Sequence, residues 1–333
     1  MSTRALPLPS LLVCLALAGA AQAQASDAPH DADESASAAL ISRNTVRSGD
    51  SRLIVIVENA PNRARADELQ AWLAECAKAA QTAFGRFPLR EATVHIRLVP
   101  RRGRDSSPVP WGQTTRGDGV GVLLYVRDDA SLSELRADWT AVHELSHLFH
   151  PFLGDEGRWL AEGLASYYQN VLRARAGMLD PDEAWRRLDG GFQRGRQVGS
   201  GRRMDEIGWS RGSTMRIYWA GAAFWLDADL ALRRERGIDL GRVLDRYSQC
   251  CLDGDEHVEP EAFIAALDRA GGAGTLARLY QRYAAMKDFP SLDTAYRALG
   301  LQSQDDALKF SDEADAKRLR RAIMAPAAHT SGE

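Results

Sequence analysis

The hydrophobic and polar positions of residues 51–130 follow patterns typical of strands and of one helix. Three apolar stretches have the length and residue types of strands: 52–58, 92–100 and 120–128. Between the first two, apolar residues from Leu69 to Phe84 recur at helical spacing. A segment rich in Gly, Pro and Ser, residues 103–119, precedes the third strand. We therefore predict a small α/β lobe over residues 51–130, in which His95 is an ordinary strand residue.

From Ser131 onward the pattern becomes almost entirely helical. Ser131 or Ser133 can cap a helix that runs to His150, and Pro151 ends it. Asp180 and Pro181 begin another helix as cap and first residue. Further helices are predicted at 158–177, 214–236, 238–251, 259–270 and 275–287, with a glycine-rich loop at 189–213. The fold class is therefore α+β, with a mainly helical lobe over 131–310 and a C-terminal tail at 311–333.

The N-terminal residues have the pattern of a secretory signal peptide. Arg4 precedes an apolar run from Leu11 to Ala18, and Ala21-Gln22-Ala23 fits the small-x-small rule for cleavage. The apolar run is shorter than a membrane-spanning helix, although an uncleaved anchor is an alternative. A lipoprotein site at Cys14 is disfavoured by Val13. We predict a signal peptide at 1–23, a disordered leader at 24–50, and an exported protein, periplasmic or secreted, with no permanent membrane span.

Charge and cysteine content narrow the classes of function. A formal net charge of -3 over 333 residues lacks the basic surface of a general nucleic-acid binder, so no nucleic-acid partner is expected. The short basic runs at 100–104 and 318–321 are typical of solvated surface. Beyond the signal peptide, Cys76, Cys250 and Cys251 make an odd number, so at least one thiol lacks a partner within the chain. Cys76 can pair with either of the others, and a bond between Cys250 and Cys251 would be strained.

Candidate chemistry is concentrated in residues 139–150, which read WTAVHELSHLFH. His143 and His147 stand four apart, so on a helix they share a face and can bind one ion. Glu144 can reach a water on that ion without binding the ion itself. This spacing is that of metallopeptidases, in which two histidines bind zinc and the glutamate is the general base.

A catalytic zinc site requires a third protein ligand and an open position. His150 lies three residues beyond His147 on nearly the same face, but one rigid helix would bring three ligands around an ion only awkwardly. Glu162 stands on the next predicted helix, which the turn PFLGDEG allows to pack back on the first. We predict Glu162 as the third ligand and His150 as a supporting or helix-end residue.

These residues resemble a known family. HELSH, followed by the glutamate of WLAEGLASYY, is similar to the gluzincin metallopeptidases, and most similar to the glycyl aminopeptidase family. The resemblance implies a thermolysin-like architecture with one Zn²⁺ between the lobes. It also implies that His143, His147 and Glu162 bind zinc and that Glu144 activates water. Related enzymes place a tyrosine beside the oxyanion in a segment of the form Y-x-x-G-A, which Tyr218, Gly221 and Ala222 match. The resemblance therefore implies that Tyr218 donates a hydrogen bond to the oxyanion, although Tyr218 can equally be a packing residue.

The sequence departs from that family in three respects. We find no PDZ-like segment, and the large N-terminal β region of such enzymes is absent or reduced. Aminopeptidases also bind the free amine of the substrate with a carboxylate near the substrate-binding edge strand. The corresponding stretch, PWGQTTRGDGVGVLLYV, contains Asp118 but no glutamate, so aminopeptidase specificity is not implied.

The predicted function is that of an exported zinc peptidase that hydrolyses peptide bonds of a peptide or protein substrate through a metal-activated water. An extended substrate could add to the glycine-rich edge at 112–121 as a further strand. Two alternatives remain: a catalytically inactive zinc- or peptide-binding protein that retains the gluzincin fold, and a structural exported protein with a chance motif. Metal binding separates the last from the other two, and peptide hydrolysis separates those two.

Overall fold

A computed structural model describes residues 40–103, 107–199, 201–208, 210, 212–304 and 307–326. The chain divides into two compact units, residues 1–38 and residues 39–333, and all described residues belong to the second. The predicted signal peptide at 1–23 lies outside the described residues. Within the described part of the chain, no helix is both long and apolar enough to cross a bilayer.

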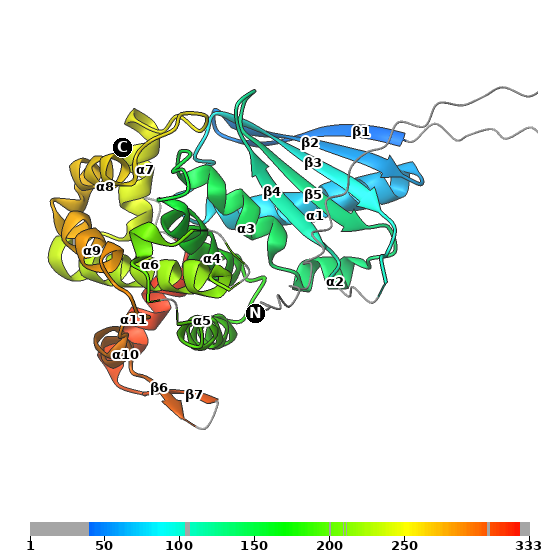
Figure 1. The fold of residues 1–333 in the computed structure, drawn as a ribbon. Helices are drawn as coiled ribbons and strands as arrows, with labels where there is room; N and C mark the ends of the chain where they lie inside the picture. Colours follow the sequence, from blue (N-terminus) through cyan, green and yellow to red (C-terminus); the bar gives the residue numbers. More distant parts are fainter. Residues whose placement is uncertain are drawn as a thin grey trace, which may run out of the picture. The chain divides into compact units, whose positions relative to one another are not determined.

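A five-stranded sheet forms the first part of the described chain (Figure 1). Its order is β1-β2-β3-β5-β4, with β2, β3 and β5 parallel and the two outer strands antiparallel to their neighbours. The three predicted strands are confirmed as β2 (Ser51–Ala60), β3 (Glu91–Val99) and β5 (Gly121–Arg127). The short edge strand β4 (Trp111–Thr115) arises within the segment read as a loop.

The predicted disordered leader is wrong for its last residues, because β1 occupies Leu40–Ser48. This strand forms a tight hairpin with β2 through Gly49, whose φ of 55° suits glycine. Its side chains are mostly polar and carry no hydrophobic alternation. Backbone pairing with β2 is the main contact of this edge strand, with a hydrogen bond from Gln70 to Ser42 beside it, so the side-chain pattern gave no signal. Residues 24–39 of the predicted leader lie outside the described residues.

Helix α1 (Arg63–Gln81) packs between the sheet and the helices that follow. Its buried face contains Leu69, Trp72, Leu73 and Cys76, as the helical spacing predicted. The Trp72 indole N–H donates to the Leu135 carbonyl at 3.1 Å. This contact ties the sheet's covering helix to the segment that leads into the candidate site.

The single helix predicted over 131–150 is interrupted. It is divided into α2 (Leu132–Ala137), α3 (Thr140–Ser146) and the 3₁₀ turn η1 (His147–Phe149). Asp138 is extended, and its carboxylate accepts from the Thr140 N–H at 2.7 Å, so it starts a new helix. Ser131 caps α2 with a capping box to Glu134. The interruption leaves His143, Glu144 and His147 on one short segment.

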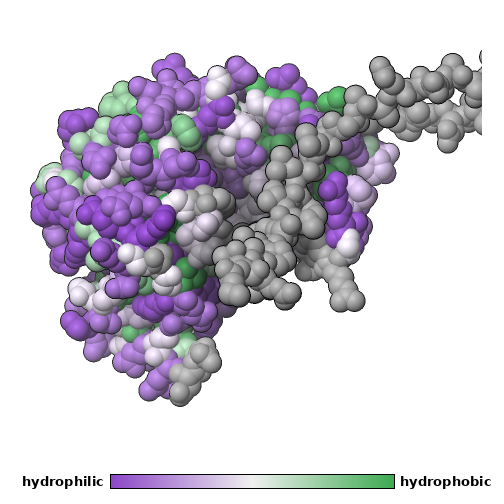
Figure 2. Space-filling view, viewed as in Figure 1, coloured by the Kyte–Doolittle hydropathy of each residue, from purple (hydrophilic) through white to green (hydrophobic). Residues whose placement is uncertain are grey.

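The remaining helices agree with the predicted pattern in most places. They are α4 (Arg158–Arg175), α5 (Pro181–Arg196), α6 (Thr214–Arg236), α7 (Leu240–Cys250), α8 (Pro260–Leu267), α9 (Thr275–Ala284), α10 (Asp293–Leu299) and α11 (Ala314–Met324). Shorter elements are η2 (Met204–Glu206), η3 (Asp268–Gly272) and the hairpin of β6 (Leu301–Gln304) and β7 (Ala307–Phe310). Hydrophilic residues predominate on the face shown in Figure 2.

Two predictions for the helical part need correction. The loop at 189–213 is helical up to Arg196, because Gly191 lets α5 pack directly on the Trp219 ring of α6. The predicted tail contains α11, whose Ile323 and Met324 are buried. The Ile323 carbonyl accepts from the Arg175 guanidinium at 2.8 Å, which anchors α11 to α4. Residues 327–333 lie outside the described residues.

The cysteine pairing left open by the sequence is resolved in an unexpected way. Cys250 and Cys251 form a disulfide, although the sequence argument disfavoured this neighbouring pair. Cys76 keeps a free thiol inside the core, and burial raises its pKa to about 12. None of the three contributes to the candidate site described next.

Candidate metal centre

Helix α3 presents the motif residues to the interior of the protein. His143, Glu144 and His147 are all buried, with less than a tenth of their surface exposed. The neighbouring apolar residues Val142, Leu145 and Leu148 bury the rest of the segment in the core. Figure 1 shows α3 lying beside β4 and α4. An inward-facing pair of histidines requires polar partners, which the surrounding elements provide.

Helix α4 brings Glu162 to the two histidines, as predicted. Its Oε2 lies 3.2 Å from His143 Nε2 and 3.6 Å from His147 Nε2. One ligand atom from each residue lies within 4.8 Å of the others. Ligands at about 2.0–2.2 Å from a tetrahedral zinc stand about 3.3–3.6 Å apart. The donor set and its spacing therefore fit a single zinc ion.

A chain of hydrogen bonds fixes which nitrogen each imidazole presents. His150 Nδ1 lies 2.7 Å from the Pro151 carbonyl, which can only accept, so His150 donates there. His150 Nε2 then accepts from His147 Nδ1 at 2.9 Å. His143 Nδ1 lies 2.8 Å from Gln169 Oε1. Each of the two candidate ligands thus donates through Nδ1, so Nε2 is the nitrogen that faces Glu162 and that would bind an ion.

Electrostatics set the charge of Glu162 and of His150 at neutral pH. Burial raises the pKa of the Glu162 carboxyl, but hydrogen bonds with His143 and His147 outweigh burial and hold its pKa well below the ordinary value. Burial, together with the charges of His147 and Arg116, holds the pKa of His150 well below its ordinary value. Glu162 is therefore a carboxylate and His150 a neutral acceptor at neutral pH.

Helix α6 packs against α4 at two glycines and places Tyr218 at the site. A side chain on Gly163 would overlap the backbone of Gly221, so the helices touch directly. The Tyr218 ring stacks on His143, with centroids 5.7 Å apart and planes 10° apart. Burial and the nearby Glu162 raise the pKa of Tyr218 well above its ordinary value. Tyr218 therefore remains a protonated phenol that can donate a hydrogen bond.

Strand β4 and the loop after it close the other side of the site. A Cβ on Gly112 would lie 2.7 Å from Glu144 Cγ, so the strand passes directly over this glutamate. Thr114 Oγ1 lies 3.2 Å from Glu144 Oε2. Arg116 donates to the carbonyls of His147 at 2.8 Å and His150 at 3.1 Å. Burial lowers the pKa of Arg116 to about 10, which leaves it cationic at neutral pH.

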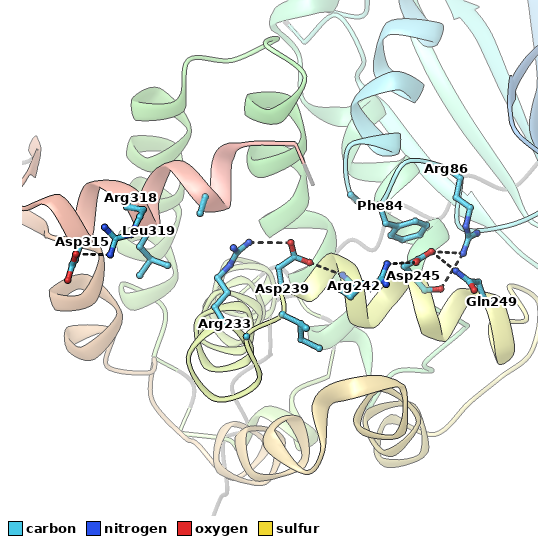
Figure 3. A pocket seen from close by; sticks show the side chains of 14 residues that line it. Phe84, Arg86, Arg233, Asp239, Arg242, Asp245, Gln249, Asp315, Arg318 and Leu319 are labelled. Carbon is cyan, nitrogen blue, oxygen red and sulfur yellow. Dashed lines mark hydrogen bonds and ion pairs between the residues drawn. The ribbon is translucent and has the colours of Figure 1, made fainter. Parts of the chain in front are cut away.

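A cavity of about 460 Å³ opens between β4 and the helices at these residues. Its lining includes Gly112, Glu144, His147, Glu162 and Tyr218. We call it the central cavity. A cavity of about 950 Å³ lies elsewhere, between the residues that follow α1, the end of α6, helix α7 and helix α11 (Figure 3). Its arginines are paired with carboxylates, such as Arg233 with Asp239 and Arg86 with Asp245. Size alone therefore does not identify the functional site.

Several contributors to the site were not predicted. Gln169 stands seven residues after Glu162, two turns along the same face of α4, and that spacing could have indicated it. Thr114 and Arg116 gave no signal, because they reach the motif only through the folding of the sheet edge. The supporting position predicted for His150 is where the structure places it.

Comparison with known proteins finds similarity to the same group of peptidases that the motif resembles. The profile of the M61 glycyl aminopeptidase family matches residues 149–218, a stretch that contains both Glu162 and Tyr218. No curated protein matches the chain.

Two solved structures illustrate the similarity of fold. An aminopeptidase N family protein from Idiomarina loihiensis aligns with a TM-score of 0.58 and 14% identity, over 79% of this chain and 49% of its own. An M1 zinc metallopeptidase variant from Deinococcus radiodurans, bound to a Tyr-Ser-Ala substrate, aligns with a TM-score of 0.50 and 19% identity, over 76% of this chain and 54% of its own. The chain thus spans about half the length of the structures it matches. In motif and fold, it is similar to gluzincin-type peptidases related to the glycyl aminopeptidase family.

Proposed function

We propose that this protein is a zinc-dependent peptidase that hydrolyses peptide bonds. The observation that supports it most strongly is the set of three ligand atoms from His143, His147 and Glu162, which lie within 4.8 Å of one another. The central cavity beside them is lined by His147, Glu162 and the proposed base Glu144. In this proposal one ion lies between the sheet edge and the helices. When bound, zinc supplies a Lewis acid that lowers the pKa of a water toward about 7.

The residues of the chain have distinct roles in the proposed reaction. Glu144 accepts a proton from the attacking water and later passes it to the leaving nitrogen. Tyr218 donates a hydrogen bond to the oxygen on which negative charge develops. Thr114 supports this assignment by holding one Glu144 oxygen at 3.2 Å, so the other can face the water.

We infer that an extended substrate pairs with β4. This strand lies at the edge of the sheet, and Gly112 lets its backbone approach Glu144 closely. Gly112→Ala should therefore lower kcat/KM for peptides by about tenfold or more, because the added methyl group displaces Glu144 or the strand. Zinc content should be unchanged. Unaltered peptide kinetics in this variant would contradict the placement of the substrate.

Export is part of the same proposal. It rests on the N-terminal pattern of Arg4, the apolar run and Ala21-Gln22-Ala23. A secreted or periplasmic fraction of expressing cells should contain protein whose first residue is Gln24, as determined by N-terminal sequencing. Recovery of chains that retain the first residues from the cytoplasm alone would argue against export.

The decisive experiment for the activity compares wild type with Glu144→Gln on a mixed peptide library. Wild type should release fragments, and the variant should be slower by at least about a thousandfold while keeping its zinc. Zinc binding without hydrolysis by wild type would indicate an inactive zinc- or peptide-binding protein. Equal fragments at equal rates from both proteins would show that another group, or a contaminant, cleaves the library.

A further inference from the structure

A second cavity adjoins the central cavity at Tyr218. Its volume is about 500 Å³, and Tyr218 lines both cavities. We call it the arginine pocket. Helices α4, α5 and α6 and the residue before α3 contribute its lining: Trp139, Ser166, Gln169, Asn170, Glu183, Arg186, Arg187, Gly190, Arg194, Met215, Tyr218 and Trp219.

The path of β4 leads toward this pocket. Arg116, just after the strand, contacts the His147 carbonyl at the end of the motif, whereas Gly112 faces Thr140 at its start. The strand therefore runs alongside α3 in the same direction, from Thr140 toward His147. A peptide that lies along β4 and passes Glu144 toward Gly112 would next approach Trp139, which precedes Thr140 and lines the arginine pocket.

The charges that line the arginine pocket are unbalanced. Three arginines of α5 face it, and Glu183 is the only carboxylate in its described lining. Glu183 pairs with Arg187 at 3.0 Å and more distantly with Arg186 at 3.8 Å. Arg194 stacks on the Trp219 ring, 5.1 Å from its centroid, and no carboxylate among the described residues pairs with it. The aromatic ring thus holds a cation in place without neutralising it.

A neutral polar group adds to this lining. Ser166 is 1% exposed, and its hydroxyl has no hydrogen-bond partner in the described part of the chain. It stands one turn after Glu162 on α4 and lines the arginine pocket. A buried hydroxyl without a partner is costly, and an acceptor brought by a ligand would satisfy it.

The central cavity, by contrast, offers no group reserved for an amine. Its described lining contains two carboxylates, Glu144 and Glu162, and both belong to the proposed catalytic site. The charges that are available for substrate recognition beside the site are therefore positive.

We propose that the arginine pocket binds a carboxylate of the peptide substrate beside the cleaved bond, and that Arg194 determines this specificity. The carboxylate belongs either to an Asp or Glu side chain or to the C-terminus of the substrate. This inference rests on the proposed peptidase function. Arg194 provides the charge, Ser166 a neutral donor, and Trp139 and Trp219 the walls.

Three matched peptides test the proposal and distinguish the two sources of the carboxylate. All have a blocked N-terminus: one carries a Glu beside the cleaved bond and an amidated C-terminus, one Gln and a free C-terminal carboxylate, and one Gln and an amidated C-terminus. Wild type should cleave at least one carboxylate peptide with kcat/KM about five- to tenfold above the neutral peptide. The arm that shows the preference identifies the source. Equal rates for all three peptides would overturn the proposal.

Arg194→Gln should remove this preference and leave cleavage of the neutral peptide within about twofold, since a neutral substrate leaves the charge unused. Arg196→Gln is the matched control. Arg196 lies on the same helix and stacks on Phe289, but it is not part of the pocket lining. This control should keep the wild-type preference. A preference that survives in Arg194→Gln, with thermal unfolding like that of wild type, would overturn the proposal.

Binding separates failure of this proposal from failure of the proposed function. The same peptides are titrated into Glu144→Gln, with tryptophan fluorescence from the pocket walls as the signal. The carboxylate peptide should bind about five- to tenfold more tightly than the neutral one, and added salt should reduce the difference. If wild type cleaves neither these peptides nor the mixed library but this binding preference is present, the peptidase proposal fails and the pocket assignment stands. If wild type cleaves all three peptides equally and no binding preference appears, the pocket assignment fails and the peptidase proposal stands.

Discussion

At the scale of single residues, the account depends on how the two imidazoles are oriented. His150 accepts from His147 Nδ1 and donates to the Pro151 carbonyl, so it fixes the tautomer of a proposed ligand. His150→Ala should weaken zinc binding about 10- to 100-fold, the usual cost of losing an outer partner. Competition with a fluorescent chelator would measure the dissociation constant.

His95→Ala is the matched control for that measurement. His95 pairs with Glu58 on the sheet, at 2.9 Å, and has no contact with the candidate site. Zinc affinity in this variant should equal that of wild type. Equal losses in the two variants, or none in His150→Ala, would show that the hydrogen bond from His150 does not support the metal.

Sequence predicted the local part of the site and missed the part that depends on tertiary structure. His143, Glu144 and His147 follow from helical spacing, and Glu162 from the motif on the next helix. The contribution of β4 could not be predicted in this way, because WGQTT has neither the hydrophobic alternation nor the length that marks a strand. Which residue of an edge strand faces the motif depends on the register with β5, and no local pattern encodes that register.

At the scale of elements, the contact between α4 and α6 sets the distance between Glu162 and Tyr218. Gly163→Ala should destabilise the protein by about 1–3 kcal/mol, because the added methyl group forces the helices apart. It should also reduce zinc affinity, since Glu162 precedes this position. Urea unfolding measures the first effect.

Gly190→Ala is a matched control in the middle of α5. A Cβ there would meet only the end of the flexible Arg194 side chain, at 3.6 Å. Since alanine favours the helix more than glycine does, this variant should be as stable as wild type or more so. Similar destabilisation in both variants would rule out the contact between α4 and α6 as the cause.

Arg116 joins the loop after β4 to the end of the motif segment. It donates to the carbonyls of His147, His150 and Gly254. Arg116→Gln should lower kcat/KM by about tenfold, because a small displacement of the motif misaligns Glu144 and the ligands. Arg101→Gln is the control, because the one ion pair of Arg101 among the described residues is an exposed pair with Asp129. Normal peptide kinetics in a folded Arg116→Gln variant would contradict a positioning role.

The errors at this scale have physical causes. β1 was missed because it is held by backbone pairing at a sheet edge, with polar side chains that resemble a disordered segment. The end of α5 was missed because its glycines lower helix propensity but allow close contact with Trp219. In both cases tertiary contacts outweighed the local preference. Helix α6, by contrast, was predicted at 214–236 because its apolar residues recur over its whole length.

At the scale of the whole molecule, zinc should stabilise the folded unit formed by residues 39–333. The proposed ligands come from α3, η1 and α4, so unfolding would destroy the site. Free zinc at about 100 times its dissociation constant should add about 2.7 kcal/mol to the free energy of unfolding. Thermal unfolding with zinc and with a chelator would measure the shift. No shift in wild type would contradict a site that exists only in the folded protein.

The most direct test of the central claim is the zinc content of purified protein after dialysis, determined by elemental mass spectrometry. The account predicts about one zinc per chain in wild type and in Glu144→Gln, because Glu144 is not a ligand. It predicts almost none in His147→Ala and in Glu162→Ala, provided that both remain folded by circular dichroism. Wild type without zinc, or a full equivalent of zinc in both ligand variants, would contradict it.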